Sequence, residues 1–175
     1  MIADTVTWIT SGVMGFVTEN MALIGPIVFV LGFAESIAFV SLLVPSTLLF
    51  LGIGGLHHAA GGSFWEVWLY GAAGAFIGDV LSYLVGRYFK DEMSGVWPFN
   101  RRPEWYLLAR RYSDQYGSVG IIGSKFLGAL RPFVPMVAGA MRMPFPVFIA
   151  ASAASCLAWA GAFLSPGYGI GFLLR

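Results

Sequence analysis

Four charged side chains stand alone in long apolar stretches of the sequence: Glu35, Asp79, Lys125 and Arg131. By insertion scales, each would cost about 2.5–3.5 kcal/mol at the centre of a membrane-spanning helix. A chain that accepts this cost four times is expected to pair these charges or to expose them to a wet cavity. The two acids precede the two bases, so pairing across the chain would neutralise all four. In this structural interpretation the four charges only neutralise one another and have no role in binding or proton uptake.

A functional interpretation uses the same four residues. Dehydration favours the neutral form of a carboxyl group, so Glu35, and after it Asp79, are candidates for proton uptake. An arginine binds phosphate through paired N–H donors, and a lysine binds it as a point charge. Arg131 and Lys125 are therefore candidates for binding an anionic headgroup. The residues leave both interpretations open.

Composition places these charges in a membrane. Of the 175 residues, 58% are hydrophobic and only 11% are charged, whereas soluble domains carry about 25% charged residues. Residues 36–65 and 143–174 contain no Asp, Glu, Lys or Arg, and about 20 apolar residues suffice to cross a bilayer core. We therefore expect an all-α polytopic membrane protein in which residues 1–175 form one domain.

The basic residues indicate how the chain is oriented. Six of the ten Lys and Arg residues lie between positions 87 and 111: Arg87, Lys90, Arg101, Arg102, Arg110 and Arg111. The positive-inside rule predicts that such a cluster is cytoplasmic. Residues 101–117 also place aromatic and leucine side chains at helical spacing beside these arginines, which predicts an amphipathic helix lying in the headgroup plane. An ordinary solvated loop is the alternative.

Hydropathy predicts where the spans and breaks fall. Residues 65–86 and 145–164 are the clearest spans, and a short Gly-rich tail follows the second. Residues 5–18 are apolar but short, which favours an interfacial or tilted helix. Residues 36–56 contain Pro45 and a glycine cluster, which predicts a broken helix.

Two segments of the sequence share one plan. Residues 44–54 and 134–140 each begin with Val-Pro after an apolar run that holds an ionisable residue, and each precedes a strong span. Short or broken segments in corresponding positions are typical of inverted-repeat transporters. Irregular backbone at membrane depth must be covered by protein or line a cavity. We predict an inverted repeat of two opposed re-entrant helical hairpins, with a first half at about 21–90, a basic connector at about 91–117 and a second half at about 118–172. Plain Pro-kinked helices are the alternative.

Other residues indicate little chemistry. His57 and His58 are adjacent, so on a helix their side chains point in different directions, and no metal site is predicted. Cys156 is interpreted as a small packing residue. No serine-histidine-aspartate or paired-carboxylate arrangement stands out, so the sequence predicts neither an enzyme nor a cofactor. Nucleic acid is not an expected partner.

Several motifs resemble the DedA family, also called VTT-domain or SNARE-associated Golgi proteins. Residues 78–87, GDVLSYLVGR, are similar to the family's Gly-Asp-x-x-x-Tyr-x-x-Gly-Arg motif. Residues 125–139, KFLGALRPFVPMVAG, resemble its basic hairpin. The other matches occur in the family's order: FAES (33–36), MPFPVF (143–148), Trp159 and GYGIG (167–171). The residues that support these motifs are Pro45, Gly78, Tyr83, Gly86, Arg87, Pro135 and Gly139.

The resemblance, which covers about residues 25–172, implies a protein that moves lipids across membranes. Bacterial members recycle undecaprenyl phosphate or flip phospholipids and depend on the proton-motive force, whereas eukaryotic relatives are scramblases. It implies a bacterial inner-membrane protein in which Glu35 is the family's membrane acid and Arg131 its second hairpin arginine. The leading prediction is a proton-linked flippase for a phosphorylated lipid, which could act as a homo-oligomer. A passive scramblase or a structural membrane protein is the alternative.

The sequence departs from the family pattern at three places. Ser46 and Thr47 stand where many members have an acid just after the first-hairpin proline. Gly128 stands where proline is frequent. Lys125 replaces the first hairpin arginine, so it keeps the charge without the bidentate fork. These departures weaken a two-carboxylate relay in the first hairpin and alter the expected phosphate geometry.

Overall fold

The fold was obtained as a computed structural model. It describes residues 23–37, 46–95, 99–126 and 131–173, together with Gly12, Gly15, Glu19 and Asn20. The elements are α2 (Ile24–Ser36), α3 (Ser46–Ala59), α4 (Phe64–Phe89), the 3-10 helix η2 (Lys90–Gly95), α5 (Pro103–Ser124), α6 (Phe133–Ala140) and α7 (Phe145–Leu173). The all-helical prediction is confirmed. Most of the predicted helix at residues 5–18, and also Pro45 and Gly128, lie outside the described residues.

Helices α4 and α7 are long and apolar enough to cross a bilayer, and they match the two predicted spans. Helix α7 continues through Pro166 to Leu173, where the sequence predicted only a Gly-rich tail. Gly167 in this part of α7 is a helix-packing residue. A side chain at Gly167 would clash with the carbonyl oxygen of Leu51 in α3, so the small residue lets two backbones approach.

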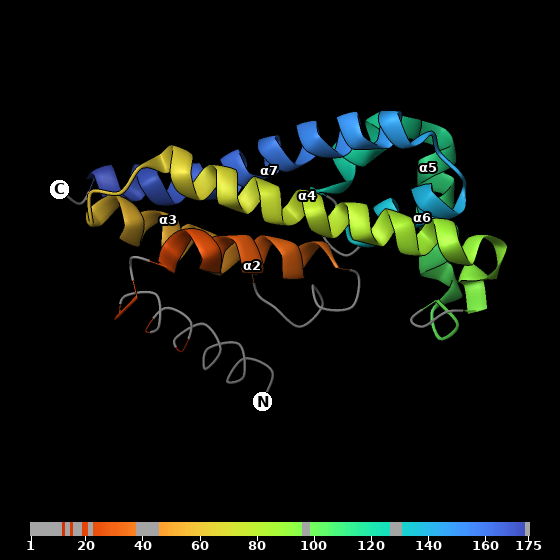
Figure 1. Cartoon of the computed structure of the whole chain (residues 1–175), viewed down its shortest axis with the longest axis horizontal. Helices are drawn as coiled ribbons and strands as arrows, with labels where there is room; N and C mark the ends of the chain where they lie inside the picture. Colours follow the sequence, from red (N-terminus) through yellow and green to blue (C-terminus); the bar gives the residue numbers. More distant parts are fainter. Residues whose placement is uncertain are drawn as a thin grey trace.

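The two long helices run side by side along the molecule, with α2 and α3 near one end and α5 and α6 near the other (Figure 1). They are antiparallel, because the ring of Tyr83 stacks on Phe148 while Gly71 lies against Ala160. Helix α2 packs on α4, α3 packs on α7, and α6 packs on α4. Helices α4 and α7 therefore join the other helices into one body.

Two hydrophobic clusters fill the interior. One joins the C-terminal part of α4 to α5, α6 and the start of α7, and its largest buried members are Tyr83, Phe99, Phe133 and Phe148. The other joins α2 and α3 to the N-terminal part of α4 and the rest of α7, and its largest buried members are Phe50, Ile53 and Trp159. At the boundary between the two clusters, α4 and α7 each carry buried polar residues.

The helix breaks fall where the sequence places ionisable and proline-containing segments. Helix α2 ends at Ser36 and α3 begins at Ser46, while α5 ends at Ser124 and α6 begins at Phe133. In the part of the chain that the structure describes, α3 has 14 residues and α6 has 8, fewer than the roughly 20 that a full span needs. Short helices beside breaks agree with hairpins, but the re-entrant geometry and the inverted repeat stay predictions.

The basic connector does form a helix. Helix α5 begins at Pro103 and bends at Gly117, whose φ of 52° lies in the left-handed region. Trp105 packs against Phe133, whereas Leu107 and Leu108 are each more than half exposed. Exposed leucines beside arginines are the expected surface of an interfacial helix. Its position in the headgroup plane and its cytoplasmic side stay predictions.

The close approach of α4 and α6 gives a test of the packing. A side chain at Gly86 would clash with the carbonyl oxygen of Met136. We expect Gly86→Ala to lower the stability by about 1–3 kcal/mol, because overpacking forces backbone shifts. Thermal unfolding in detergent measures the effect. Gly169→Ala is the control, since nothing lies within 4 Å of its added carbon. Equal melting of both variants would show that α4 and α6 are not this close.

Candidate functional site

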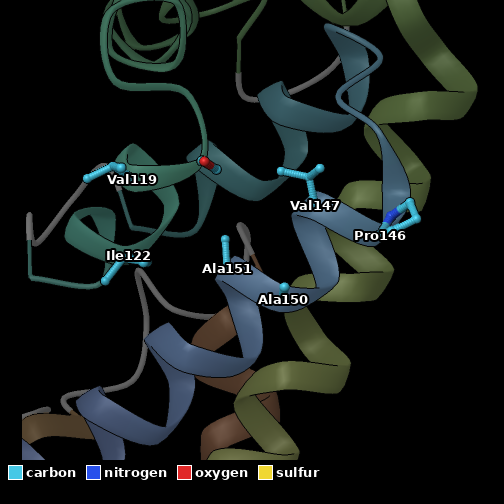
Figure 2. Close-up of a pocket in the computed structure, with 7 residues that line it drawn as sticks. Val119, Ile122, Pro146, Val147, Ala150 and Ala151 are labelled. Carbon is cyan, nitrogen blue, oxygen red and sulfur yellow. The ribbon is translucent and has the colours of Figure 1, made fainter.

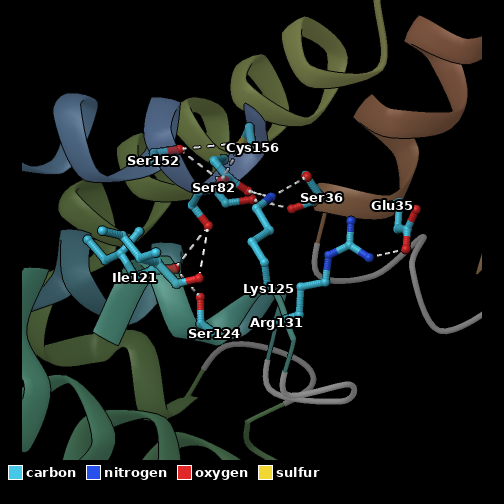
Figure 3. A network of polar contacts seen from close by, with 12 residues as sticks. Glu35, Ser36, Ser82, Ile121, Ser124, Lys125, Arg131, Ser152 and Cys156 are labelled. Atoms are coloured by element: carbon cyan, nitrogen blue, oxygen red, sulfur yellow. Dashed lines mark hydrogen bonds and ion pairs between the residues drawn. The ribbon is translucent and has the colours of Figure 1, made fainter. Parts of the chain in front are cut away.

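A polar network lies at the boundary of the two hydrophobic clusters (Figure 3). On α4, Asp79 follows the second cluster's Ala75 and precedes the first cluster's Tyr83. At 1.5 Å per residue, Asp79 is about 22 Å from the start of α4 and about 15 Å from its end. If α4 spans the bilayer, this network lies well inside the hydrocarbon core.

Asp79 and Lys125 form one buried ion pair. The ammonium nitrogen of Lys125 lies 2.8 Å from Asp79 Oδ1 and donates to Ser36 Oγ at 3.0 Å. The second oxygen, Asp79 Oδ2, accepts hydrogen bonds from Ser152 Oγ at 2.9 Å and from the Cys156 thiol at 3.4 Å. Both side chains of the ion pair are 1% exposed. Every oxygen of this carboxylate therefore has a donor, which is what a buried charge requires.

Glu35 and Arg131 form a second buried ion pair that is less complete. Arg131 Nη1 donates to Glu35 Oε1. Within the described ranges, Glu35 Oε2 has no donor, and Arg131 Nε and Nη2 have no acceptor. The guanidinium carbon lies 4.1 Å from the centroid of the Trp159 ring, a cation–π distance. The two pairs thus differ in how fully the protein satisfies them.

The C-terminal end of α2 brings the two pairs together. Glu35 and Ser36 occupy its last turn, where the helix dipole is negative and favours nearby cations. Helix α2 can approach α4 because a side chain at Gly78 would lie 2.7 Å from Ser36 Cβ. Ser82 Oγ also donates to the Ser36 carbonyl oxygen at 3.1 Å. Gly78 of the sequence motif therefore makes room for the network.

The other motif residues support the packing around the network. The Tyr83 hydroxyl donates to the Met143 carbonyl oxygen, and Arg87 Nη1 donates to the Tyr83 hydroxyl at 3.2 Å. Gly139 allows α6 to contact the backbone of α4 at Tyr83. Pro135 is buried within α6. These residues hold α4, α6 and the start of α7 in place.

The structure brings together all four charged residues that the sequence singled out. Each acid of the first half contacts a base of the second half, as the pairing interpretation expects. The same contact places Glu35 and Arg131 in one site, as the functional interpretation expects. Their roles in proton uptake and headgroup binding stay predictions.

Sequence reasoning missed the neutral partners of these charges. Ser36, Ser152 and Cys156 complete the Asp79 site, and Trp159 lies against Arg131. Cys156 is buried, as a packing residue should be, but its thiol also contacts the carboxylate. The sequence did contain a signal. Ser152, Cys156 and Trp159 follow one another on α7 by four and three positions, so they share one helix face.

A separate apolar groove lies between α5 and the start of α7 (Figure 2). It has a volume of about 550 Å³ and includes Val119, Ile122, Val147 and Ala151 in its lining. Its one hydroxyl side chain is Ser118. The groove offers apolar surface without a charged group, so the polar network is the stronger candidate for chemistry.

Comparison with known proteins defines the class. The family model of the VTT domain matches residues 44–169. Since the match covers most of the chain, the protein belongs to the VTT-domain family, also called the DedA family. The resemblance inferred from the sequence motifs is thereby confirmed.

The chain is similar to several bacterial membrane proteins. It is 28% identical over 169 residues to an uncharacterized membrane protein of Buchnera aphidicola from Acyrthosiphon pisum, covering 97% of this chain and 64% of that protein. It is 33% identical over 153 residues to the inner membrane protein YabI of Escherichia coli K12, covering 87% and 60%. An uncharacterized membrane protein of Mycobacterium leprae is 28% identical, covering 96% and 73%.

The chain thus spans about three fifths of the length of the first two relatives. No solved structure matches it. The family and the relatives, together with the two apolar helices, show that it is an integral membrane protein.

Proposed function

We propose that this protein moves a phosphorylated lipid across the bacterial inner membrane and that the proton gradient drives the movement. The observation that carries the proposal is the incomplete ion pair. Arg131 is buried, and two of its guanidinium nitrogens have no acceptor in the described part of the chain. Buried N–H donors are costly when unmatched, and a phosphate oxygen is a strong acceptor for arginine. Undecaprenyl phosphate or a phospholipid would supply one.

Glu35 links this site to protons. As a carboxylate it occupies Arg131 Nη1. Protonation would remove its charge and weaken its hold on the guanidinium, so that an anionic headgroup could take its place. Loss of the proton would restore the pair and expel the headgroup. The buried charge therefore stays compensated at each step, as a low-dielectric site requires.

Lys125 and Asp79 have a secondary role in this function. Lys125 is a candidate for headgroup binding by its charge, but its ammonium group already contacts Asp79 and Ser36. Asp79 already accepts from three side chains. Headgroup binding and proton uptake at Lys125 and Asp79 would require these contacts to break, so Arg131 and Glu35 come first.

A passive scramblase or a structural membrane protein is the second candidate. It is favoured by the pairing of each buried acid with a buried base. In that case the pairs serve only to neutralise charge, and a proton gradient has no effect on lipid movement.

A reconstitution experiment separates the two candidates. Purified protein in liposomes is given a labelled phosphorylated lipid or a zwitterionic lipid, with and without a pH gradient. We expect the phosphorylated lipid to cross faster than in protein-free liposomes, and a pH gradient to accelerate it further. Equal rates with and without the gradient would favour the passive protein. Release of inorganic phosphate from the lipid would indicate an enzyme and contradict both.

A further inference from the structure

We infer that Trp159 is a second anion-binding residue of this site, whose indole N–H donates to the same headgroup as Arg131. The inference rests on the proposed function. Trp159 is fully buried, and its Nε1 has no acceptor among the described residues. Its ring lies against the Arg131 guanidinium, so the unmatched donors belong to two side chains in direct contact.

A packing role alone does not account for this indole. A buried tryptophan N–H usually finds a hydrogen-bond partner. The chain provides one for Trp68, which donates to the Leu157 carbonyl oxygen at 2.9 Å. Trp159 lies deeper, in a T-shaped contact with Phe50 at a centroid distance of 4.9 Å, and its N–H has no N or O acceptor within the described ranges.

The unmatched groups indicate which kind of partner would satisfy them. At this site three of them are N–H donors, namely Nε and Nη2 of Arg131 and Nε1 of Trp159, and one is an acceptor, Oε2 of Glu35. The ammonium group of Lys125 also lies 6.0 Å from the Trp159 ring centroid, so two cations flank one ring. A partner with several acceptor oxygens and a negative charge satisfies this arrangement. An oxyanion such as phosphate fits it better than a neutral group does.

The ring also positions the guanidinium. An arginine over an indole face is held by cation–π attraction, which leaves its N–H edge free to form planar hydrogen bonds. Trp159 would thus contribute a surface that orients Arg131 and a donor of its own. These two contributions can be separated, because phenylalanine keeps a ring and removes the donor.

The test uses the 175-residue chain in detergent and inorganic phosphate as the probe. Phosphate binding is measured from the rise in unfolding temperature, against chloride at equal ionic strength. We expect Trp159→Phe to raise the dissociation constant for phosphate by about tenfold, which is the scale of a hydrogen bond to a charged group. The unfolding temperature without phosphate should also fall, because the smaller ring leaves a cavity in the second cluster, so phosphate affinity is taken from the rise above each variant's own phosphate-free value. Trp68→Phe, which removes a matched N–H, should lower that temperature and leave phosphate affinity unchanged.

A second measurement observes phosphate binding in the wild-type protein and uses the variants only to assign its signals. In wild-type protein labelled with nitrogen-15, the indole N–H signals are assigned by Trp→Phe variants. We expect phosphate to shift the Trp159 signal and to leave the Trp68 signal in place. An unmoved Trp159 signal, or equal phosphate affinity in Trp159→Phe and wild type, would show that the indole does not bind phosphate, and would overturn this inference while leaving the proposed function intact. A wild type that phosphate does not stabilise would overturn the proposed anion site, and the inference with it.

Discussion

Lys125→Met should destabilise the protein by about 3–5 kcal/mol, which is the usual effect of stranding a buried charge. The substitution leaves the Asp79 carboxyl group 1% exposed and without its cation. Ser152 and Cys156 would remain as donors to one carboxylate oxygen, but neither carries a positive charge. Thermal unfolding of the purified protein in detergent measures the loss.

A rescue and a control define the cause of that loss. The double variant Asp79→Leu/Lys125→Met removes both charges, and a buried ion pair replaced by apolar residues is often neutral or stabilising. We expect it to recover much of the lost stability. Arg110→Met is the matched control, because Arg110 is exposed on α5. If Lys125→Met unfolded at the same temperature as the Arg110→Met control, the ion pair between Lys125 and Asp79 would not contribute to stability.

Arg131→Gln should reduce lipid transport by about 10- to 100-fold, the equivalent of losing hydrogen bonds to a charged group. The substitution would remove the two guanidinium nitrogens that have no acceptor in the described ranges, and the headgroup would lose these donors. Liposome flipping at matched protein content measures the effect. Arg110→Gln should keep most of the activity, because neighbouring arginines of the connector can replace one surface charge.

Arg131→Lys refines this comparison. It keeps the charge beside Glu35 but lacks the planar fork of the guanidinium. We expect intermediate transport, with weaker phosphate binding than in the wild type. If Arg131→Gln and Arg110→Gln lost the same activity, general surface charge and not a buried site would determine transport.

Much of the fold could be predicted because the chain must satisfy its backbone within the membrane. Uncharged or nearly uncharged runs at 65–86 and 145–164 predicted α4 and α7. The extension of α7 past Pro166 could not be predicted, because glycine normally indicates a helix end. Here Gly167 allows the close contact with α3, a tertiary effect that overrides local propensity.

The charges of the site were predictable, but their partners were not. An isolated acid or base in an apolar run is conspicuous, so Glu35, Asp79, Lys125 and Arg131 could be named from the sequence. Hydropathy does not reveal which base meets which acid, since that depends on how α2 and α4 pack. Serine and cysteine are ordinary small packing residues of helices and tryptophan is typical of membrane interfaces, so only the helical spacing along α7 could have indicated the neutral partners.

The central claim is that Glu35 acts by taking up a proton, and Glu35→Gln tests it most directly. The amide is nearly isosteric with the carboxyl group and can still accept a hydrogen bond from Arg131, but it cannot be protonated over the same range of pH. The measurement is lipid flipping in liposomes with and without a pH gradient, beside thermal unfolding of the same protein. We expect near wild-type stability, reduced transport and no response to the gradient. A variant that unfolds early, by the roughly 3–5 kcal/mol expected of a stranded cation, and yet transports with a full response to the gradient would contradict the account.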